Sequence, residues 1–488
     1  MTTYDVVLRG GRVIDPKSGL DDVCDVAIAG DRVAAVGIGL PAGRVEADVA
    51  GQVVTAGFVD LHSHARDLGS ARLQVADGVT TALELEAGCT PVAAAYAAAA
   101  VTGRPLNYGF AASWTMARMA VLADVTPDGG AESLFANLAN PRWQREASAT
   151  EIGRVLRLLE ADVADGALGI GLLLGYAPGT APEEYVRVAA LAAASGVPTF
   201  THARDLVEFT PDGPVDGAEE IVRTAGETGA RMHYCHVNST TLRHADRVLG
   251  LVERAQRAGA QVSTEAYPYG AGMTGIGAAF LAPNRLAARG LTPRSIIYAP
   301  TGEEVATAAR LSELRAVDPG GLAIIRQLDD DDPADQAVLQ RYLTFPGSVI
   351  ASDAMPLTWI GAAPEPAVWP LPPTAVTHPR TAGTYARSIR TLSRGGGPPL
   401  SEILAKCSLR PAALLQDRVP AMRRKGRVSA GSDADIVVFD ADGITDQATY
   451  STSTRPSSGI RHVLVNGTFV VRDGQLDTNA RPGRPVRA

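Results

Sequence analysis

Short runs of apolar and β-branched residues alternate with helical stretches through the middle of the chain, from residue 57 to residue 417. Runs of this length and density are typical of strands buried in a parallel sheet. Eight such runs are present: FVDLHSH, VTTALELE, NYGFAAS, ALGIGLLL, PTFTHA, RMHYCHV, QVSTEAYPY and GSVIASD. Eight strands alternating with helices predict an α/β fold, specifically a TIM-like (β/α)8 barrel.

The two ends of the chain show a different pattern, in which short β-rich runs are separated by turn residues. VVLRGGRVID and DVAIAGDRVAAVG place Gly-Gly and Gly-Asp between such runs, which predicts two hairpins near the N-terminus. Near the C-terminus, HVLVNGTFVVRDG holds Asn466-Gly467, the strongest short hairpin signal, because both central positions of a type I′ turn need positive φ. We therefore expect one small β-sandwich domain built from residues 1–56 and 418–488, with the barrel at 57–417.

An insertion at about 284–345 breaks the alternation between the seventh and eighth predicted strands. It contains ELRAVDPGG and the acidic run DDDDPADQ. Long insertions after barrel strands lie on the catalytic face and often form lids. A solvated helical excursion with a charged tip explains the same composition, and the sequence leaves both readings open.

Composition narrows the class of protein. The 488 residues carry a net charge of -8, which argues against nucleic acid or an anionic membrane as the main partner and favours solubility. The partner that we expect is a small-molecule substrate. The four cysteines include no CxxC pair, so no disulfide framework or zinc-finger spacing is visible. No signal-peptide pattern and no membrane-length apolar run are visible, so we expect a cytoplasmic protein. Such barrels commonly associate with copies of themselves, so the sequence leaves a homo-oligomer as an alternative to a monomer.

Polar residues gather at the ends of the predicted barrel strands, where barrel enzymes place their chemistry. They are His62 and His64 on the first strand, Glu84 and Glu86 on the second, His202 on the fifth, His236 on the sixth and Asp353 on the eighth. One histidine at a strand end is more often structural than a ligand, but this joint set of nitrogen and oxygen donors fits a Zn²⁺-type site.

Two further residues lie near this set. Asp60 precedes His62 by two, shares its face one layer deeper, and is expected to orient a ligand imidazole as a hydrogen-bond acceptor. His233 precedes His236 by three, which places it on the opposite face of the sixth strand and predicts a structural role.

The stretch GFVDLHSH resembles the strand-one metal motif of the amidohydrolase superfamily. THARD, HYCHVNST and ASDAMP fall where that superfamily has its strand-five His, strand-six His and strand-eight Asp. The resemblance is greatest to the N-acyl-D-amino-acid deacylases (D-aminoacylases), through GALGIGLLLGYAPG, EAYPYGAGMT, HPRTAGTYAR and the C-terminal tail. It covers nearly the whole chain apart from the insertion.

The resemblance implies one or two Zn²⁺ ions held by the strand-end residues and an amide hydrolase mechanism. A metal-bound water of lowered pKa would attack the amide carbonyl. Asp353 would accept its proton and later pass it to the leaving amine, as general base and then general acid. His236 would bind the metal or help polarise the carbonyl.

One departure concerns the bridge between two metals. ALGIGLLL lacks the lysine that many amidohydrolases use, and the deacylases use a cysteine in a GNCG motif instead. In ELEAGCT that place is taken by Ala87, so Glu86 is the best substitute, since a carboxylate can bridge or ligate. Glu84 shares its face one pleat deeper, and Cys89 is the alternative if the loop is bulged.

Other departures concern the residues that would bind substrate. Asn238 stands where the deacylases have a lysine, which leaves Arg380 and Tyr269 as candidates to hold a carboxylate, with Arg204 a weaker one. Trp114 stands where the family has Gly-His and is a candidate to line the pocket. The competing readings are a surface salt bridge for Arg380, a structural turn for Tyr269 and a packed core indole for Trp114.

Three functions remain in competition. The first is a zinc-dependent hydrolase that cleaves the amide of N-acyl-D-amino acids. The second is an amidohydrolase for a cyclic amide or imide, or for an isoaspartyl-type dipeptide, since HVN after strand six is similar to the isoaspartyl dipeptidases. The third is a catalytically silent binding protein, against which the intact ligand set together with Asp353 argues.

Overall fold

The computed structural model describes residues 4–213, 215–364, 368–394 and 396–488, and a sheet of eight strands lies at its centre. All neighbouring strands in this sheet are parallel. In spatial order they are β6 (Phe58–Asp60), β7 (Val79–Cys89), β8 (Asn107–Ser113), β9 (Ile170–Leu173), β10 (Thr199–His202), β11 (Met232–Tyr234), β12 (Val262–Ala266) and β17 (Ser348–Ile350). Seven of them fall within predicted runs and β7 extends one run by three residues, so the predicted TIM-like barrel is confirmed.

The first and last barrel strands meet just beyond their carboxyl ends. Ser63 and Ala354 form a parallel bridge, and the backbone N–H of His64 donates to the Ala354 carbonyl at 2.7 Å. This contact ties the chain after β6 to the chain after β17. It therefore brings the predicted first-strand histidines and Asp353 to the same place.

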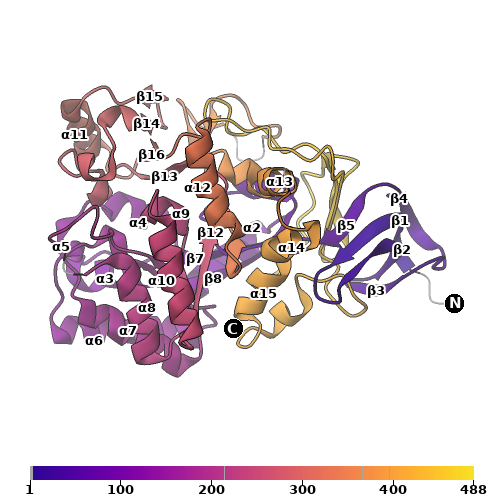
Figure 1. Cartoon of the computed structure of the whole chain (residues 1–488), viewed down its shortest axis with the longest axis horizontal. Coiled ribbons are helices and arrows are strands. Elements are labelled where there is room, and N and C mark those ends of the chain that lie inside the picture. The colour runs from indigo at the N-terminus through magenta and orange to yellow at the C-terminus, as the bar shows by residue number, and fades with distance from the viewer. Residues whose placement is uncertain (1–3, 214, 365–367, 395) are drawn as a thin grey trace.

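Helices surround the central sheet (Figure 1). They are α1 (Leu68–Ala76), α2 (Val92–Thr102), α3 (Trp114–Ala123), α4 (Glu132–Asn137), α5 (Pro141–Gln144), α6 (Ala149–Ala164), α7 (Pro182–Ser195), α8 (Gly217–Thr228), α9 (Val237–Thr241), α10 (Ala245–Arg257), α11 (Ala308–Val317), α12 (Pro333–Thr344), α13 (Arg380–Leu392), α14 (Leu400–Leu404) and α15 (Arg410–Leu415). Single turns of 3₁₀ helix occur at 174–176, 279–281, 287–289, 293–295 and 420–424, and a π-helical turn at 405–409.

The helix α6 shows how the sequence specifies these elements. Ser148 caps its first turn and forms a reciprocal capping box with Glu151, which satisfies two backbone N–H groups that the helix leaves free. Ile152, Val155 and Leu159 recur at helical spacing and are buried against the barrel core. The opposite, polar face of α6 faces the solvent.

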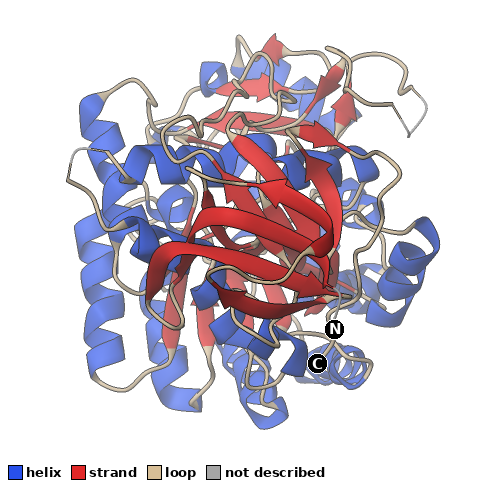
Figure 2. Cartoon of the chain, turned by 90° about the vertical axis from the view of Figure 1, so that its right-hand side faces the viewer, coloured by secondary structure: helices blue, strands red, loops and turns tan. Residues whose placement is uncertain are grey.

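Both ends of the chain contribute to one nine-stranded sheet, at the right of Figure 1 and in front of the helices in Figure 2. The strands are β1 (Tyr4–Asp15), β2 (Leu20–Ala29), β3 (Arg32–Gly37), β4 (Gly43–Asp48), β5 (Val53–Ala56), β20 (Ile436–Phe439), β21 (Ile460–Val465), β22 (Thr468–Arg472) and β23 (Gln475–Leu476). The join is the antiparallel pair of β5 and β20. Apolar side chains of both ends form a common core.

Two of the three predicted hairpins in this sheet are confirmed and one is wrong. β2 and β3 turn at Gly30-Asp31, and β21 and β22 turn at Asn466-Gly467, where φ is 48° and 79°. Gly10-Gly11 makes no turn, because β1 continues through it with a shift of register against β2. A Cβ on Gly11 would lie 2.6 Å from the Val54 side chain, so this glycine serves close packing.

The long connection between β12 and β17 forms a second small sheet. It is antiparallel and contains β13 (Ala271–Gly275), β14 (Ile296–Tyr298), β15 (Glu303–Glu304) and β16 (Leu322–Arg326). The sheet begins before the expected insertion at 284–345, and α12 near its end packs on α10 and β12. The acidic run supplies Asp332, whose carboxylate caps α12. A two-stranded sheet, β18 (Thr358–Trp359) and β19 (Ala375–Val376), follows β17.

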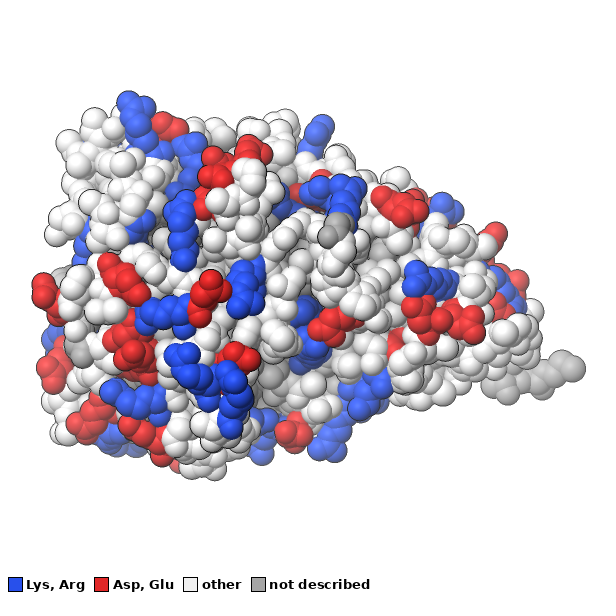
Figure 3. Space-filling model, in the orientation of Figure 1, with Lys and Arg blue, Asp and Glu red and all other residues white. Residues whose placement is uncertain are grey.

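Charged side chains of both signs are interspersed over the face that Figure 3 shows. This mixture is ordinary for a protein surface and forms no extended basic stripe of the kind that tracks a phosphate backbone. Among the described residues, no helix is long and apolar enough to cross a lipid bilayer.

The last residues of the chain cover the amino-terminal side of the barrel. Tyr108 in β8 donates its N–H to the Arg484 carbonyl at 3.1 Å and accepts from the Val486 N–H at 2.7 Å. The Tyr96 hydroxyl donates to the Val486 carbonyl. Val486 is 2% exposed and packs among apolar residues that include Val59. The tail therefore acts as part of the barrel core.

Replacing Val486 with Ala should lower the free energy of unfolding by about 1–3 kcal/mol, because a buried side chain loses two methyl groups and leaves a void. Denaturant unfolding measures the change. Val101 is 89% exposed in α2, so Val101→Ala is a matched control with an expected change within about 0.5 kcal/mol. Equal unfolding midpoints for Val486→Ala and the unsubstituted chain would show that the tail contributes no core packing.

Candidate metal centre

A bulge in β7 brings Glu86 into the mouth of the barrel. Between Glu84 and Cys89, five steps along β7 match only two along β8, so the intervening residues arch out of the sheet. Gly171 in β9 makes room for the arch, since a Cβ there would lie 2.3 Å from the Glu86 carbonyl oxygen. The glycine in ALGIGLLL thus permits the backbone position that carries this carboxylate.

The first group of donor atoms forms around one oxygen of Glu86. The Nε2 atoms of His62 and His64 lie 3.1 Å apart. Glu86 Oε2 lies 3.2 Å from Nε2 of His62 and 3.5 Å from Nε2 of His64. All three side chains are buried.

The second group forms around the other oxygen of the same carboxylate. Nδ1 of His202 and Nε2 of His236 lie 3.0 Å apart, and Glu86 Oε1 is 3.1 Å from the former and 2.7 Å from the latter. Ligands 2.0–2.2 Å from a tetrahedral ion lie roughly 3.3–3.6 Å apart. The spacing in the first group, 3.1–3.5 Å, is close to this, and that in the second, 2.7–3.1 Å, is tighter. The two groups are thus suited to two adjacent cations that share Glu86 as a bridge.

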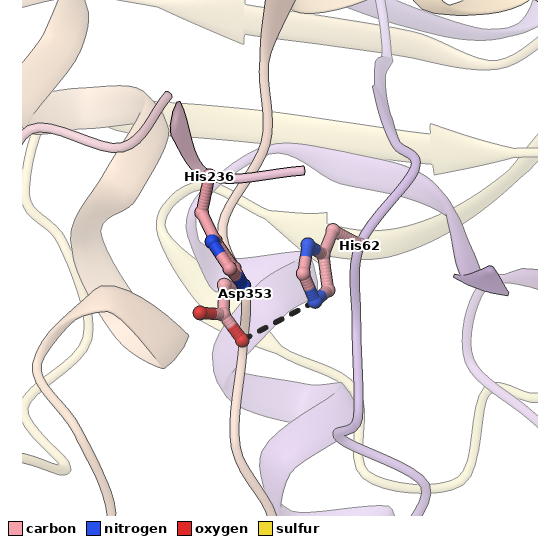
Figure 4. A group of neighbouring side chains, drawn as sticks. All are labelled: His62, His236 and Asp353. Carbon is pink, nitrogen blue, oxygen red and sulfur yellow. Dashed lines mark ion pairs between the residues drawn. The ribbon is translucent and has the colours of Figure 1, made fainter. Parts of the chain in front are cut away.

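Asp353 faces the first group from β17. Its Oδ1 lies 3.4 Å from Nε2 of both His62 and His64, and Figure 4 shows it directed toward His62 beside His236. The backbone φ is 49° at Asp353 and 26° at His236, values that non-glycine residues rarely adopt. Backbone strain of this kind is held in place by surrounding structure and concentrates at functional sites.

The charge of the site calls for cations. Four buried carboxylates converge here, from Glu84, Glu86, Glu265 and Asp353, and the buried guanidinium of Arg380 pairs with Asp353. Buried carboxylates without compensating positive charge cost several kcal/mol each. Two divalent ions among neutral imidazoles would supply that charge, so the donor set fits the metals that the sequence predicts.

The pKa values of key groups follow from burial and neighbouring charge. Burial acts to raise the pKa of Glu86, but the imidazoles of His62, His236 and His202 hold it well below its usual range. The pKa of Asp353 is lowered in the same way, burial being outweighed first by Arg380. Burial lowers the pKa of His202 to about 4, which keeps this imidazole neutral and available as a ligand.

Each imidazole is held from behind through its other nitrogen, except His202. His64 Nδ1 lies 2.8 Å from a carboxylate oxygen of Glu84, and His236 Nδ1 lies 3.1 Å from Ser239 Oγ. His62 Nδ1 contacts Glu265 on β12. Such contacts orient a ligating imidazole and fix which nitrogen faces the metal.

Asp60 does not have the role expected from the sequence. Its carboxylate accepts the backbone N–H groups of His62 and Ser352 at 3.2 and 3.0 Å and the Gln74 amide at 2.9 Å. It therefore holds the backbone below the site, while Glu265 orients the imidazole of His62. A carboxylate inside the otherwise uncharged run QVSTEAYPY is the sequence signal that could have indicated Glu265.

His233 also differs from expectation. A regular strand would direct it away from His236, but β11 ends at Tyr234 and the chain then turns sharply. As a result the His233 side chain and the His236 backbone N–H both reach Glu265, at 2.9 and 3.1 Å.

Of the three candidates for the bridge between two metals, Glu86 is the one whose two oxygens each lie in one of the two donor groups. Glu84 lies behind His64, and Cys89 belongs to none of the donor groups found among the described residues. Burial raises the pKa of the Cys89 thiol to about 12, which leaves it protonated and a poor ligand. The bulge on which the Cys89 alternative depended is present, but it places Glu86, and not Cys89, at the site.

A cavity of about 60 Å³ opens over the two groups. It is lined by His64, Glu86, His202, His236, Asp353 and Arg380 at its base. Apolar walls come from α4 and the small antiparallel sheet, with Phe135, Leu138, Met273 and Ile325. The long connection after β12 therefore covers the site directly.

Arg380 is buried at this cavity and is no surface salt bridge. Its Nη2 lies 2.8 Å from Asp353 Oδ2, and its Nε donates to the Asp353 carbonyl at 2.6 Å. Its guanidinium lies over the Tyr267 ring, 4.7 Å from the centroid. Its Nη1 is buried and has no hydrogen-bond partner among the described residues.

The other proposed substrate-binding residues lie outside the cavity lining. Tyr269 is buried against His378 and Arg387, and Tyr267, two residues earlier, lines the cavity in its place. Asn238 contacts the backbone of Tyr267 at 3.4 Å. Sequence spacing could not tell which of the two tyrosines in YPY faces inward.

Trp114 and Arg204 serve the barrel wall. The indole of Trp114 is fully buried and donates to Glu184 at 2.9 Å, as the reading of a packed core residue predicted. Arg204 pairs with Glu220 at 2.8 Å and donates to the Thr180 carbonyl. Neither side chain lines the cavity.

Known proteins are similar to this chain in both sequence and fold. A model of the amidohydrolase family matches residues 45–471. A D-aminoacylase of Alcaligenes xylosoxydans xylosoxydans is 30% identical over 99% of this chain and 97% of its own, and an N-acyl-D-glutamate deacylase of the same organism is 29% identical over 99% and 96%. A solved D-aminoacylase described with a binuclear metal centre has a TM-score of 0.78 and 25% identity, covering 99% of this chain and 100% of its own.

Replacing Glu86 with Gln should weaken metal binding at both positions by at least about tenfold, because the bridge loses its charge and one acceptor oxygen. Dialysis against buffered Zn²⁺ followed by elemental analysis measures the bound metal. Cys89→Ser is the matched control and should keep the metal content of the unsubstituted chain. Unchanged metal content in Glu86→Gln, or a loss in Cys89→Ser, would contradict the assignment of the bridge.

Proposed function

Because the chain belongs to the amidohydrolase family, we propose that it hydrolyses the amide bond of N-acyl-D-amino acids with Zn²⁺ ions held at the barrel mouth. The observation that carries the proposal is the pair of donor groups joined by Glu86, with Asp353 and the cavity directly above. The full-length relatives named as a D-aminoacylase and an N-acyl-D-glutamate deacylase support the substrate class.

The donor set supports Zn²⁺ as the metal. Four imidazoles and a carboxylate are nitrogen and oxygen donors that suit Zn²⁺ among the common divalent ions. Bound there, Zn²⁺ supplies Lewis-acid polarisation of the scissile carbonyl and lowers the pKa of a coordinated water. His62 and His64 would hold one ion, and His202 and His236 would hold the other.

Asp353 is the residue that moves the proton. Arg380 binds its Oδ2 and lowers the pKa of the carboxyl, so the carboxylate form is present at neutral pH with Oδ1 directed at the first donor group. From there it accepts the proton of the attacking water and passes it to the leaving nitrogen. The products are a free carboxylate and a D-amino acid.

Arg380 also supports recognition of the substrate's α-carboxylate. Its Nη1 is a buried donor that lacks a partner in the described part of the chain, which is costly unless a ligand supplies one. A Cβ at Gly272 would lie 3.4 Å from the Tyr267 hydroxyl and 3.8 Å from Nη1, so the glycine keeps the space between these two donors open. A carboxylate there would accept from both, and a simple cyclic imide has no such group to offer.

We expect the Zn²⁺-reconstituted enzyme to hydrolyse N-acetyl-, N-formyl- or N-succinyl-D-amino acids and to discriminate against the L-enantiomers. A paired D and L panel, followed by release of free amine, measures the preference. The control is the chelator-treated enzyme, which should be inactive and regain activity with Zn²⁺. Hydrolysis of L-compounds alone, or of only hydantoins or isoaspartyl dipeptides, would contradict the proposal.

Asp353→Asn should lower kcat by about 10²–10⁴-fold while the metal content stays close to that of the unsubstituted enzyme, because the amide cannot accept the proton. Kinetics and elemental analysis on the same preparation separate the two effects. Asp417 has a side chain 77% exposed, so Asp417→Asn is the control and should retain full kcat. A kcat for Asp353→Asn within a few-fold of the control would remove Asp353 from the proton-transfer role.

A further inference from the structure

Glu265 lies beneath the metal centre and accepts hydrogen bonds from His62, His233 and the backbone of His236. Its Oε1 accepts from His62 Nδ1 and from the backbone N–H of His236, the latter at 3.1 Å. Its Oε2 accepts from His233 Nε2 at 2.9 Å. Glu265, His62 and His233 are each 1% exposed, so water does not compete for these contacts.

The contact with His62 determines which nitrogen can ligate a metal. A neutral imidazole has one N–H and one lone pair. Because the Glu265 carboxylate can only accept, the proton must be on Nδ1 and the lone pair on Nε2. That nitrogen is the one that lies 3.1 Å from His64 Nε2 and 3.2 Å from Glu86 Oε2.

His233 in turn holds Glu265 in place. Its Nδ1 lies 2.8 Å from Ser263 Oγ, which leaves Nε2 to donate to Glu265, and its ring packs against Phe200. Both His233 and Ser263 border a mainly apolar cavity of about 190 Å³ near the amino ends of β10, β11 and β12. The hydrogen-bonded series thus runs from the floor of the barrel to the metal centre.

We propose that Glu265 and His233 are positioning residues that orient His62 and thereby set the affinity of one of the two metal positions, that of His62 and His64. The proposal rests on the metal centre of the proposed function. The second position depends on Glu265 only through the backbone of His236, since the imidazole of His236 is held by Ser239. Removing the carboxylate should therefore affect the two positions unequally.

Burying the Glu265 carboxylate costs free energy that apolar packing does not offset. Val349 is the register partner of Glu265 and Phe200 packs on His233, and both belong to one apolar cluster. A carboxylate taken out of water loses several kcal/mol of hydration unless hydrogen bonds replace it. The donors that replace it here belong to residues 233–236, at and just after the end of β11, or to His62, which points to a role in that site.

Glu265→Gln tests the proposal with little change of shape. A glutamine offers one acceptor oxygen and one NH₂ group where three donors converge, so one imidazole must change tautomer or lose its partner. We expect one Zn²⁺ equivalent to bind 10–100-fold more weakly and the other to keep its affinity. Titration of the metal-free variant against a chromophoric chelator measures both equivalents, and the Co²⁺ visible spectrum reports the coordination of each.

Two variants of His233 add an independent measurement. His233→Gln retains an N–H donor at about the position of Nε2 and should keep near-native affinity for Zn²⁺. His233→Leu lacks this donor and should weaken binding of the same Zn²⁺ equivalent that Glu265→Gln weakens. The control is Glu184→Gln, a fully buried glutamate on α7 paired with Arg118, which should lower thermal stability without changing either equivalent.

The outcomes separate the positioning of His62 by Glu265 and His233, called the relay here, from the proposed function. Two native affinities in Glu265→Gln, or an equal loss at both positions with a lower melting temperature of the metal-free chain, would overturn the relay alone. Absence of Zn²⁺ binding by the unsubstituted chain would overturn the proposed function, and the relay with it. Selective loss of one equivalent in Glu265→Gln and His233→Leu, with recovery in His233→Gln, supports the relay.

Discussion

Glu86 gives one carboxylate oxygen to each of two pairs of imidazole nitrogens, and the barrel mouth is arranged around this shared group. A carboxylate buried among histidines is stable only if cations or protons balance its charge. Because Glu84, Glu265 and Asp353 add further negative charge, the site favours bound metal over an empty state. Asp353 pairs with Arg380 through one oxygen, which leaves the other facing the first donor group.

The backbone meets this constraint at a few strained places on an otherwise regular scaffold. The β7 bulge lifts Glu86, Gly171 makes space for it, and positive φ values at His236 and Asp353 redirect two strand ends inward. The regular strands below remain closely packed and supply the rigidity that holds these conformations. Local strain is therefore confined to the residues that face the cavity.

Much of the fold followed from the sequence, because strand runs and turn residues are local signals. All eight barrel strands and the Asn466-Gly467 turn were predictable, whereas Gly10-Gly11 was not, since only the tertiary neighbour Val54 shows that it serves packing. Strand-end position brought the predicted ligands together. It could not indicate Glu265 or the choice of Tyr267 over Tyr269, because these depend on where the chain departs from regular strand geometry.

The covering of β8 by the last residues of the chain has a consequence for biosynthesis. Strand β5 pairs with β20, and Tyr108 pairs with residues 484 and 486, so early segments have partners that are translated several hundred residues later. Domains generally fold as units as they leave the ribosome, but the nine-stranded sheet cannot form until β20 to β23 have been synthesised. Strand β5 lacks its partner until then, and chaperone protection during that interval suits a chain with such distant contacts.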